Sequence, residues 1–297
     1  MAEILPFEPQ HKAKEEFRVY APSSSEDGGL AAVVENHYRM MRENQTVEFV
    51  KRMHCKYNFA QPRATMTIRE AFAKLDGYVD SSDPDLTLPN IIHSYQTAEA
   101  IRKAGKPDWM QLVGLIHDMG KLMFLWGTPE DGQEGTATGN QFALGGDTFI
   151  VGCRIPDCTV FPQFNVLNPD SHNPLYNTEL GMYKAGCGLD NVLFAYGHDE
   201  YLYQMLVANK STIPAEGLAM ARFHSAYPWH TGKAYRQFMT EQDYINEAAV
   251  IEFNKFDLYT KDEEGGKALT RDQVEELWQY YAALIDKYFP DPQNLVW

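Results

Sequence analysis

Cysteine and long hydrophobic runs are both scarce in this sequence. Four of its 297 residues are cysteines, too few for a disulfide framework in a chain of this length, so we expect a reduced, cytoplasmic protein. Cys153 and Cys158 are close in sequence, but without a second pair we expect ordinary thiols there and no zinc site. No apolar run approaches the roughly 20 residues of a membrane span, and the first residues lack the basic-then-apolar pattern of a signal peptide.

Positive charge is scarce as well. The chain has 26 Lys and Arg against 41 Asp and Glu, which gives a formal net charge of −15 and a pI near 5.0. Phosphate backbones and anionic lipids repel such a chain, so we expect neither nucleic acid nor a membrane as a partner. Apolar residues make up 44% and charged residues 23%, as in an ordinary globular protein of one large domain or two.

Helical periodicity dominates the rest of the chain. Residues 1–27 mix prolines, charges and a serine run, which predicts an irregular arm. Apolar spacing and capping signals then predict helices over about 30–57 with a break near Asn44, and over 67–75, 91–103, 108–119, 178–184, 197–206, 215–226, 240–257 and 270–285. Extended stretches at 145–152 and 159–161 predict a small β-hairpin inside a largely irregular segment, 123–176. The predicted fold class is all-α with a small hairpin.

A histidine followed by an aspartate closes the most apolar of these helices. The stretch GLIHDMGKL at 114–122 places His117 and Asp118 at the end of a run that is hydrophobic on nearly every side, as in a buried helix. Gly120 is suited to the left-handed residue that often ends a helix. A single His-Asp pair is more often a packed histidine beside a capping acid, but in a buried segment we favour a metal site. The second carboxylate oxygen would then be free to reach another metal.

Four histidines fall on the predicted buried helices. They are His93, His117, His198 and His224, out of nine in the chain, and His198 opens a second His-Asp pair with Asp199. Taken alone, His93 favours a packed core histidine over a ligand. Imidazole and carboxylate without thiolate suit iron, manganese or zinc better than copper(I) or an iron–sulfur cluster. Spacing alone does not select a further carboxylate among 41 acidic residues, so the ligand set stays open.

These residues lie in sequence blocks that resemble one known group of proteins. The blocks are HSYQTAE at 93–99, LIHDMGK at 115–121, GDTF at 146–149, TELGMY at 178–183, YGHDEY at 196–201, RFHS at 222–225 and FNKFDLYTK at 253–261. The order H…HD…H…H…D is that of the HD-domain superfamily of helical metalloproteins. The whole set is similar to the myo-inositol oxygenase family within it, over nearly the full chain. The resemblance implies an HD-domain-like helical bundle, with 28–297 forming a single catalytic domain after the arm.

The resemblance also implies roles for individual residues. One iron would be held by His93, His117, Asp118 and Asp257, and a second iron by His198 and His224, with Asp118 bridging the two. The implied substrate contacts are Arg18, Asp80, Ser82, Lys121, Gly146, Asp147, His224 and Ser225. Lys121 and Asp118 would act in catalysis, while Tyr38 and Lys261 fall at positions that resemble the family's lid.

The implied reaction converts myo-inositol and O2 to D-glucuronate at a mixed-valent Fe(II)/Fe(III) pair, and we expect a monomer. Two alternatives remain at this stage. An HD-type metal-dependent phosphohydrolase would use the same ligands with a metal-bound hydroxide. It would need several cationic groups at the phosphate, where the candidate pocket offers chiefly Lys121 and Arg18. The other alternative is a non-catalytic interaction protein with a structural metal.

Overall fold

The computed structural model describes residues 30–76, 78, 80, 90–136, 139–259 and 270–297. The predicted arm at 1–27, with Arg18, lies outside the described residues, as do Ser82 and Lys261. Everything stated below about the structure concerns the described part of the chain.

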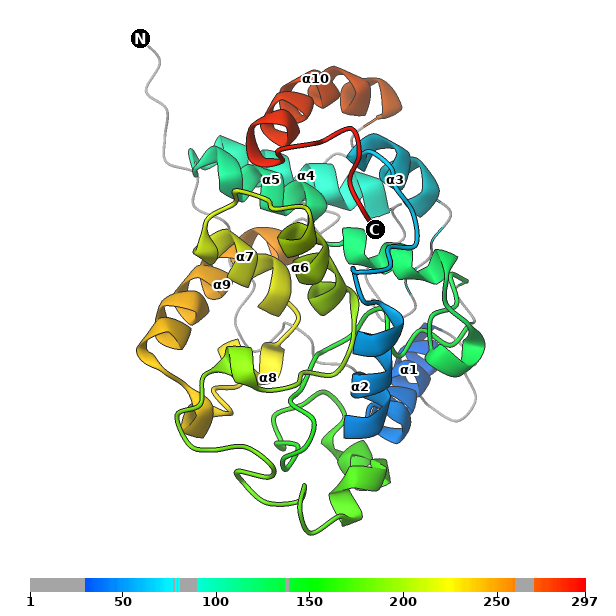
Figure 1. Ribbon diagram of the computed structural model, residues 1–297, viewed down its shortest axis with the longest axis vertical. Helices are drawn as coiled ribbons and strands as arrows, with labels where there is room; N and C mark the ends of the chain where they lie inside the picture. Colours follow the sequence, from blue (N-terminus) through cyan, green and yellow to red (C-terminus); the bar gives the residue numbers. More distant parts are fainter. Residues whose placement is uncertain (1–29, 77, 79, 81–89, 137–138, 260–269) are drawn as a thin grey trace.

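The described residues fold into α-helices joined by irregular segments, which confirms the all-α class (Figure 1). The helices are α1 (Leu30–Asn44), α2 (Val47–Lys56), α3 (Ile68–Leu75), α4 (Asn90–Lys103), α5 (Asp108–Ile116), α6 (His198–Ala208), α7 (Ala215–Phe223), α8 (Tyr227–His230), α9 (Glu241–Tyr259) and α10 (Arg271–Tyr288).

Five of these helices form the part of the molecule that matters for the site. α4 packs along α5, α7 packs between α6 and α9, and α5 touches both α7 and α9. In Figure 1, α10 lies across the top of α5, while α1 and α2 stand to one side below. Segments from residue 90 to residue 259 are therefore neighbours in space, although more than one hundred residues separate some of them in sequence.

Local sequence signals account for several helix boundaries. At the start of α3, the Thr67 hydroxyl accepts from the backbone N–H of Glu70, and the Glu70 carboxylate accepts from the backbone N–H of Thr67. Thr270 and Gln273 form the same capping box at the start of α10. The predicted break near Asn44 is confirmed, because α1 ends there and Thr46 caps α2. The apolar run of α5 is buried on all sides, as its composition predicted.

The predicted β-hairpin at 145–161 is wrong. Ile150 forms an isolated antiparallel bridge with Phe194, and no ladder joins it to 159–161 in this fully described stretch. Neighbouring backbone bonds run the same way, from Ala195 to Phe149 and from Val151 to Leu193. The extended residues therefore pair with a distant segment, and the region around them consists of turns and short 3-10 helices.

The predicted helix at 178–184 is also wrong, because these residues form successive turns. Gly181 adopts a positive φ of 56° and lies so close to Gly152 that an added Cβ would be 1.9 Å from its carbonyl oxygen. A helical turn at this point would break that approach.

The last residues of the chain lie between two other segments. Trp297 is 1% exposed, and its indole Nε1 donates to the carbonyl of Met66 at 3.0 Å. Val296 bridges to Thr65 and exchanges two hydrogen bonds with the Asn209 side chain just after α6. The tail thus joins the start of α3 to the end of α6.

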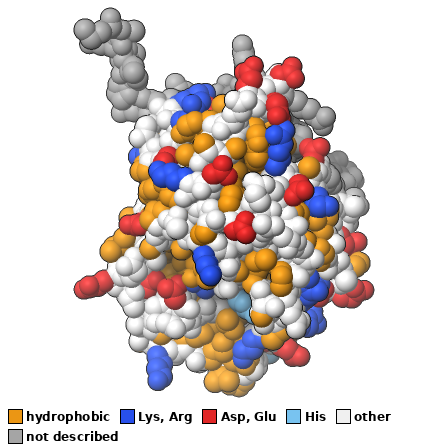
Figure 2. Space-filling view, turned by 45° about the horizontal axis from the view of Figure 1, so that its top comes forward, with side chains coloured by type: hydrophobic (Ala, Val, Ile, Leu, Met, Phe, Trp, Pro, Cys, Tyr) orange, Lys and Arg blue, Asp and Glu red, His pale blue; other side chains and the backbone are white. Residues whose placement is uncertain are grey.

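None of the described helices is both long enough and apolar enough to cross a membrane. On the face shown in Figure 2, acidic and basic side chains are interspersed with hydrophobic ones.

Candidate metal centre

His117 and Asp118 lie at the junction between two helices. α5 ends at Ile116, His117 is its C-cap, and Asp118 precedes a 3-10 helix at Met119–Leu125. The His117 Nδ1–H donates to the carbonyl of Gly114 at 2.8 Å, since a carbonyl can only accept. This bond fixes the ring and leaves the lone pair of Nε2 facing the interior, the arrangement that metal-binding histidines adopt.

The predicted left-handed turn at Gly120 is wrong, because Gly120 continues the 3-10 helix without a positive φ. Its missing side chain serves a different purpose. A Cβ on Gly120 would be 1.9 Å from the carbonyl oxygen of His198, so the glycine lets the two His-Asp segments come together.

His224 repeats the local geometry of His117. It is the C-cap of α7, a nine-residue helix like α5, and its Nδ1 donates to the carbonyl three residues earlier, Ala221, at 3.1 Å. His198 is the first residue of α6, and its Nδ1 bonds to the Leu144 carbonyl. Three imidazoles are therefore held by backbone carbonyls with Nε2 directed inward.

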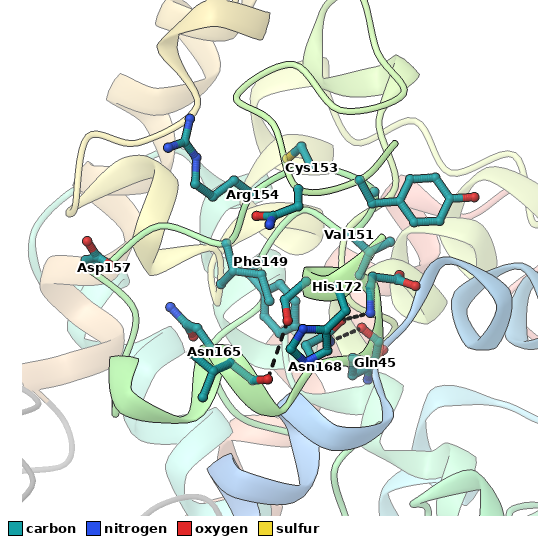
Figure 3. Close-up of a pocket in the computed structure, with 16 residues that line it drawn as sticks. Gln45, Phe149, Val151, Cys153, Arg154, Asp157, Asn165, Asn168 and His172 are labelled. Carbon is teal, nitrogen blue, oxygen red and sulfur yellow. Dashed lines mark hydrogen bonds between the residues drawn. The ribbon is translucent and has the colours of Figure 1, made fainter. Parts of the chain in front are cut away.

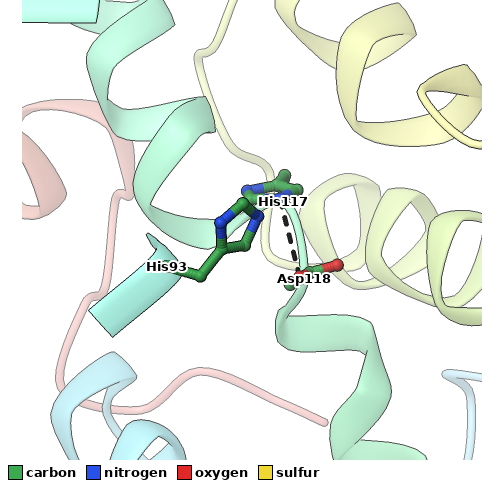
Figure 4. A group of neighbouring side chains, drawn as sticks. All are labelled: His93, His117 and Asp118. Carbon is green, nitrogen blue, oxygen red and sulfur yellow. Dashed lines mark ion pairs between the residues drawn. The ribbon is translucent and has the colours of Figure 1, made fainter. Parts of the chain in front are cut away.

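One group of donors gathers around His117. His93, from α4, has its Nε2 2.9 Å from Oδ1 of Asp257 in α9, and His117 Nε2 lies 3.3 Å from the same oxygen. Oδ2 of Asp118 is 3.6 Å from His117 Nε2. Figure 4 shows the two imidazoles beside the Asp118 carboxylate, and each of the three residues offers an atom within 4.8 Å of the others.

A second group gathers on the other side of Asp118. Its Oδ1 is 3.3 Å from Nε2 of His198 and 4.0 Å from Nε2 of His224. Asp118, His198 and His224 each offer a ligand atom, and these three atoms lie within 4.8 Å of one another, close enough to share a cation. The two oxygens of one carboxylate thus face two separate groups of imidazoles. All six residues expected as ligands, from His93 to Asp257, are at most 4% exposed.

The contact between His198 and His224 indicates that a cation belongs between them. Their Nε2 atoms are 3.0 Å apart, and both Nδ1–H groups already donate to carbonyls, so two neutral rings would direct lone pairs at each other. Two nitrogens at right angles on one metal, each about 2.1 Å away, would be separated by about 3.0 Å. The donor set therefore fits a metal ion.

Charges around the histidine pair are strongly coupled. Burial lowers the pKa of His198, but the carboxylates of Asp199 and Asp118 outweigh it and raise this pKa to about 10. Burial lowers the pKa of His224 to about 4, with His198 adding to the effect. The carboxylates of Asp199 and Asp118 thus favour positive charge at the place where a cation would sit.

Lys121 links the centre to a neighbouring aspartate. Its ammonium group is 2.9 Å from Oδ2 of Asp118 and 2.8 Å from Oδ2 of Asp80. Burial by itself raises the pKa of Asp118, but Lys121 and His117 lower it well below the usual value. Asp118 is therefore an anion in spite of its burial.

The other described residues expected as substrate contacts lie nearby. Gly146 has a φ of 85°, and a Cβ there would be 2.7 Å from Nε2 of His37 and 2.6 Å from Sδ of Met41. Asp147 accepts from the Tyr38 hydroxyl at 3.3 Å. Ser225 follows His224 directly, and its carbonyl accepts from the backbone of Thr148 at 2.9 Å, which ties it to the same loop.

Three buried polar residues in this region were given no role by sequence reasoning. Asp199 contacts His198, His224 and Ser225. His37 is buried under Gly145, and burial lowers its pKa to about 4. Arg42 is completely buried, with its guanidinium 4.6 Å from the Phe149 ring centre. The repeated His-Asp pair was a usable signal for Asp199, while neither of the others follows a recognisable motif.

A cavity of about 360 Å³ opens elsewhere, beneath residues 149–177 (Figure 3). Two of the asparagines that line it are engaged by the protein. Asn168 donates to the carbonyls of Arg42 and Gln45, and Asn165 accepts from Arg42 and Thr159. These bonds attach the irregular segment to α1, so the cavity reflects how that segment is held.

Comparison with known proteins agrees with the geometry. The family model described as myo-inositol oxygenase matches residues 31–297. The chain belongs to the myo-inositol oxygenase family. It is 49% identical to inositol oxygenase of Mus musculus and 46% identical to that of Homo sapiens, each over 282 residues that cover 94% of this chain and 90% of the relative. A probable inositol oxygenase of Oryza sativa subsp. japonica is 44% identical over 86% of this chain and 79% of its own length.

Membership in the myo-inositol oxygenase family makes this protein an oxygenase enzyme. The expected resemblance is confirmed. Neither the phosphohydrolase nor the non-catalytic alternative is supported by the comparisons.

Proposed function

We propose that this enzyme cleaves the ring of myo-inositol with O2 to give D-glucuronate, using two iron ions in the Fe(II)/Fe(III) state. The observation that carries the proposal is the position of Asp118. Its two oxygens face two imidazole groups, which is the arrangement a bridged pair of metals requires. Iron accepts such imidazole and carboxylate ligands.

The proposed ligand sets follow the two groups. His93, His117, Asp118 and Asp257 would hold one iron, and Asp118, His198 and His224 would hold the other. The first set has one more protein ligand, so the second leaves more positions for substrate oxygens. When bound, the irons would carry five positive charges against two from Asp118 and Asp257; this excess would acidify a coordinated hydroxyl group, and Fe(II) would supply the electron that activates O2.

Lys121 would be catalytic through its charge. Its ammonium group lies between Asp80 and Asp118, within a side chain that is 6% exposed. A buried cation stabilises a neighbouring alkoxide far more strongly than an exposed one. Negative charge that develops on a substrate oxygen beside Asp118 would therefore be stabilised by Lys121.

The remaining residues would bind and orient the polyol. Six hydroxyl groups need many donors and acceptors, and we propose Arg18, Asp80, Ser82, Lys121, Gly146, Asp147, His224 and Ser225 for this role. A side chain at Gly146 would meet His37 and Met41, so a contact between Gly146 and the polyol would be made by its backbone. Holding the ring on several sides fixes which carbon–carbon bond breaks and excludes water.

Oxygen consumption tests the proposal. Iron-loaded protein with a reductant such as cysteine should consume O2 only when myo-inositol is added, with one glucuronate formed per O2. Phosphate release from nucleotides, in place of O2 consumption, would establish the phosphohydrolase alternative.

Asp118→Ala should prevent assembly of the iron pair, because it removes the shared ligand. Iron content by colorimetry should fall from two per chain to one or none, and turnover should be lost. A variant that keeps two irons and full turnover would refute the bridging role.

The expectations about assembly and organisation are part of the same proposal. We propose a cytoplasmic monomer in which 28–297 form one catalytic domain. The support for one domain is that ligands from α4 to α9 meet at one centre.

A further inference from the structure

Asp199 is a buried carboxylate beside the centre that has no place in either ligand set. It is 2% exposed and follows His198 in the first turn of α6. Its Oδ1 is 2.8 Å from Nε2 of His198 and 3.6 Å from Nε2 of His224. A charge this deeply buried needs specific partners, and Asp199 has partners other than these two histidines.

Ser225 is the residue that Asp199 holds. The carboxylate accepts from the Ser225 backbone N–H through Oδ2 at 3.1 Å and from its hydroxyl through Oδ1 at 3.1 Å. The Ser225 carbonyl accepts from Thr148 at 2.9 Å. The backbone N–H, the hydroxyl proton and the carbonyl of Ser225 are therefore all hydrogen-bonded. These bonds fix the serine between α6 and the loop that carries Gly146 and Asp147.

The direction of the hydroxyl bond has a chemical consequence. A carboxylate accepts hydrogen bonds and donates none, whereas a serine hydroxyl can do either. Because the proton of Ser225 is directed at Asp199, the lone pairs of Oγ are what remain for another group. Within the described residues this hydroxyl makes no other hydrogen bond. An isolated serine beside a polyol would have no such preference.

We propose that Asp199 is a positioning residue that makes Ser225 an obligatory hydrogen-bond acceptor for one hydroxyl group of the polyol. The inference rests on the proposed function, since it concerns the same substrate. When a hydroxyl oxygen is coordinated to a cation, its remaining lone pair becomes a weaker acceptor and its O–H becomes a stronger donor. Ser225, next to His224, presents the acceptor that such a hydroxyl needs.

Ligand discrimination measures this role directly. The probes are myo-inositol and its monodeoxy analogues, each lacking one hydroxyl, titrated by calorimetry into anaerobic iron-loaded protein. For the native chain, one analogue should bind about ten-fold more weakly because the hydroxyl facing Ser225 is absent. In Asp199→Asn and Ser225→Ala, the penalty for that same analogue should shrink to about two-fold or less. The double variant should behave as Ser225→Ala alone, because both changes remove one interaction.

Two further variants serve as controls for the role of Asp199. Glu200→Gln changes the next carboxylate on α6, which binds Arg222 at 2.7 Å and does not contact Ser225, and it should keep the ten-fold discrimination. Asp199→Glu retains the acid but shifts it by one methylene, and it should lose discrimination for the same hydroxyl, which covers the case of an Asp199→Asn chain that does not fold.

Iron content separates this inference from its rival. Asp199→Asn should retain two irons per chain. Loss of iron together with unchanged discrimination would show that Asp199 is a metal ligand and would overturn the inference. Unchanged discrimination with both irons present would overturn it as well. If the native chain binds no inositol, the proposed function itself fails; if it binds and turns over inositol, only the role of Asp199 is in question.

Discussion

At the scale of single residues, two glycines beside His198 carry different steric demands. Gly120 faces the His198 carbonyl across the junction, and a Cβ there would be 1.9 Å from the oxygen. Gly197 precedes His198 in the chain, with φ −156° and no atom closer than 3.8 Å to its added Cβ. One position requires glycine because backbone approaches backbone, while the other has room for a methyl group.

Gly120→Ala should therefore destabilise the protein by about 3 kcal/mol or more, since neither backbone can move without displacing a His-Asp pair. The midpoint temperature of thermal unfolding and the iron content per chain should both fall. Gly197→Ala, the matched control, should cost less than about 1 kcal/mol as an N-cap change and retain its iron. Equal stability of the two variants would contradict the close approach described for Gly120.

Residue-level prediction from sequence was most specific where a motif exists. His93, His117, His198 and His224 were selected because they lie on buried helices, and the structure brings them to one centre. Asp257 was reached through family resemblance, because no spacing rule connects α9 to α4. Gly120 was misjudged because a helix-ending glycine and a close-approach glycine look the same in one sequence.

At the scale of elements, ion pairs attach the segment after α8 to α9. Glu247 of α9 binds Lys233 at 2.8 Å and Arg236 at 2.8 Å. Burial by itself raises the pKa of Glu247, but the bonds from Arg236 and Lys233 outweigh it and lower the pKa below the usual 4.5. The folded protein therefore holds this proton less tightly than the unfolded chain does.

The sign of that shift gives a pH prediction. The ionised Glu247 stabilises the fold fully above pH 4.5, and this contribution is lost as the pH falls through the lower folded pKa. Glu247→Gln should lower the free energy of unfolding at pH 7, and the difference from the native chain should shrink as the pH is reduced below 4.5. Urea titrations at several pH values measure it, with the exposed Glu241→Gln of the same helix as control. A difference independent of pH would contradict the assignment.

Trp297 provides a second element-scale test. Trp297→Ala removes a fully buried indole that is bonded to Met66, just before α3, and should cost about 3–5 kcal/mol. Trp297→Phe retains most of the packing but leaves the Met66 carbonyl without its donor, so it should cost about 1–2 kcal/mol. Chemical denaturation measures both, and similar losses for Ala and Phe would show that packing is not the main contribution.

The sequence predicted helices and strands correctly where their cause is local and incorrectly where it is a contact with a distant segment. Capping boxes located α3 and α10 because both partners lie within four residues. The hairpin failed because Ile150 pairs with Phe194, a partner 44 residues further along that no local pattern reveals. The segment at 178–184 failed for the same reason, since its Gly181 is set against the distant Gly152.

At the scale of the whole molecule, imidazole nitrogens and carboxylate oxygens face one another in the buried centre, and a cation between them would offset their repulsion. The proposed iron ions would bind the folded chain and not the unfolded one, so they should stabilise the fold by mass action. Fe(II) at about one hundred times its Kd, under anaerobic conditions, should add about 2.7 kcal/mol per site. This corresponds to a rise in Tm of roughly 5–10 °C relative to chelator-treated protein.

Differential scanning calorimetry with and without chelator measures that shift. Asp118→Ala should show a clearly smaller one, because the shared ligand is absent. An equal Tm for metal-free and iron-loaded native protein would mean that the centre does not bind iron in the folded state.

The span of the ligands along the chain has a consequence for biosynthesis. His93 meets Asp257, 164 residues later, and every candidate donor pair except the neighbours within each His-Asp motif comes from different helices. A ribosome releases residues in order, so most of the centre's histidines emerge well before the helix that supplies its last carboxylate. The proposed ligand set that contains Asp257 can therefore be completed only after α9 docks. A nascent chain paused before residue 257 would display the imidazoles without that carboxylate.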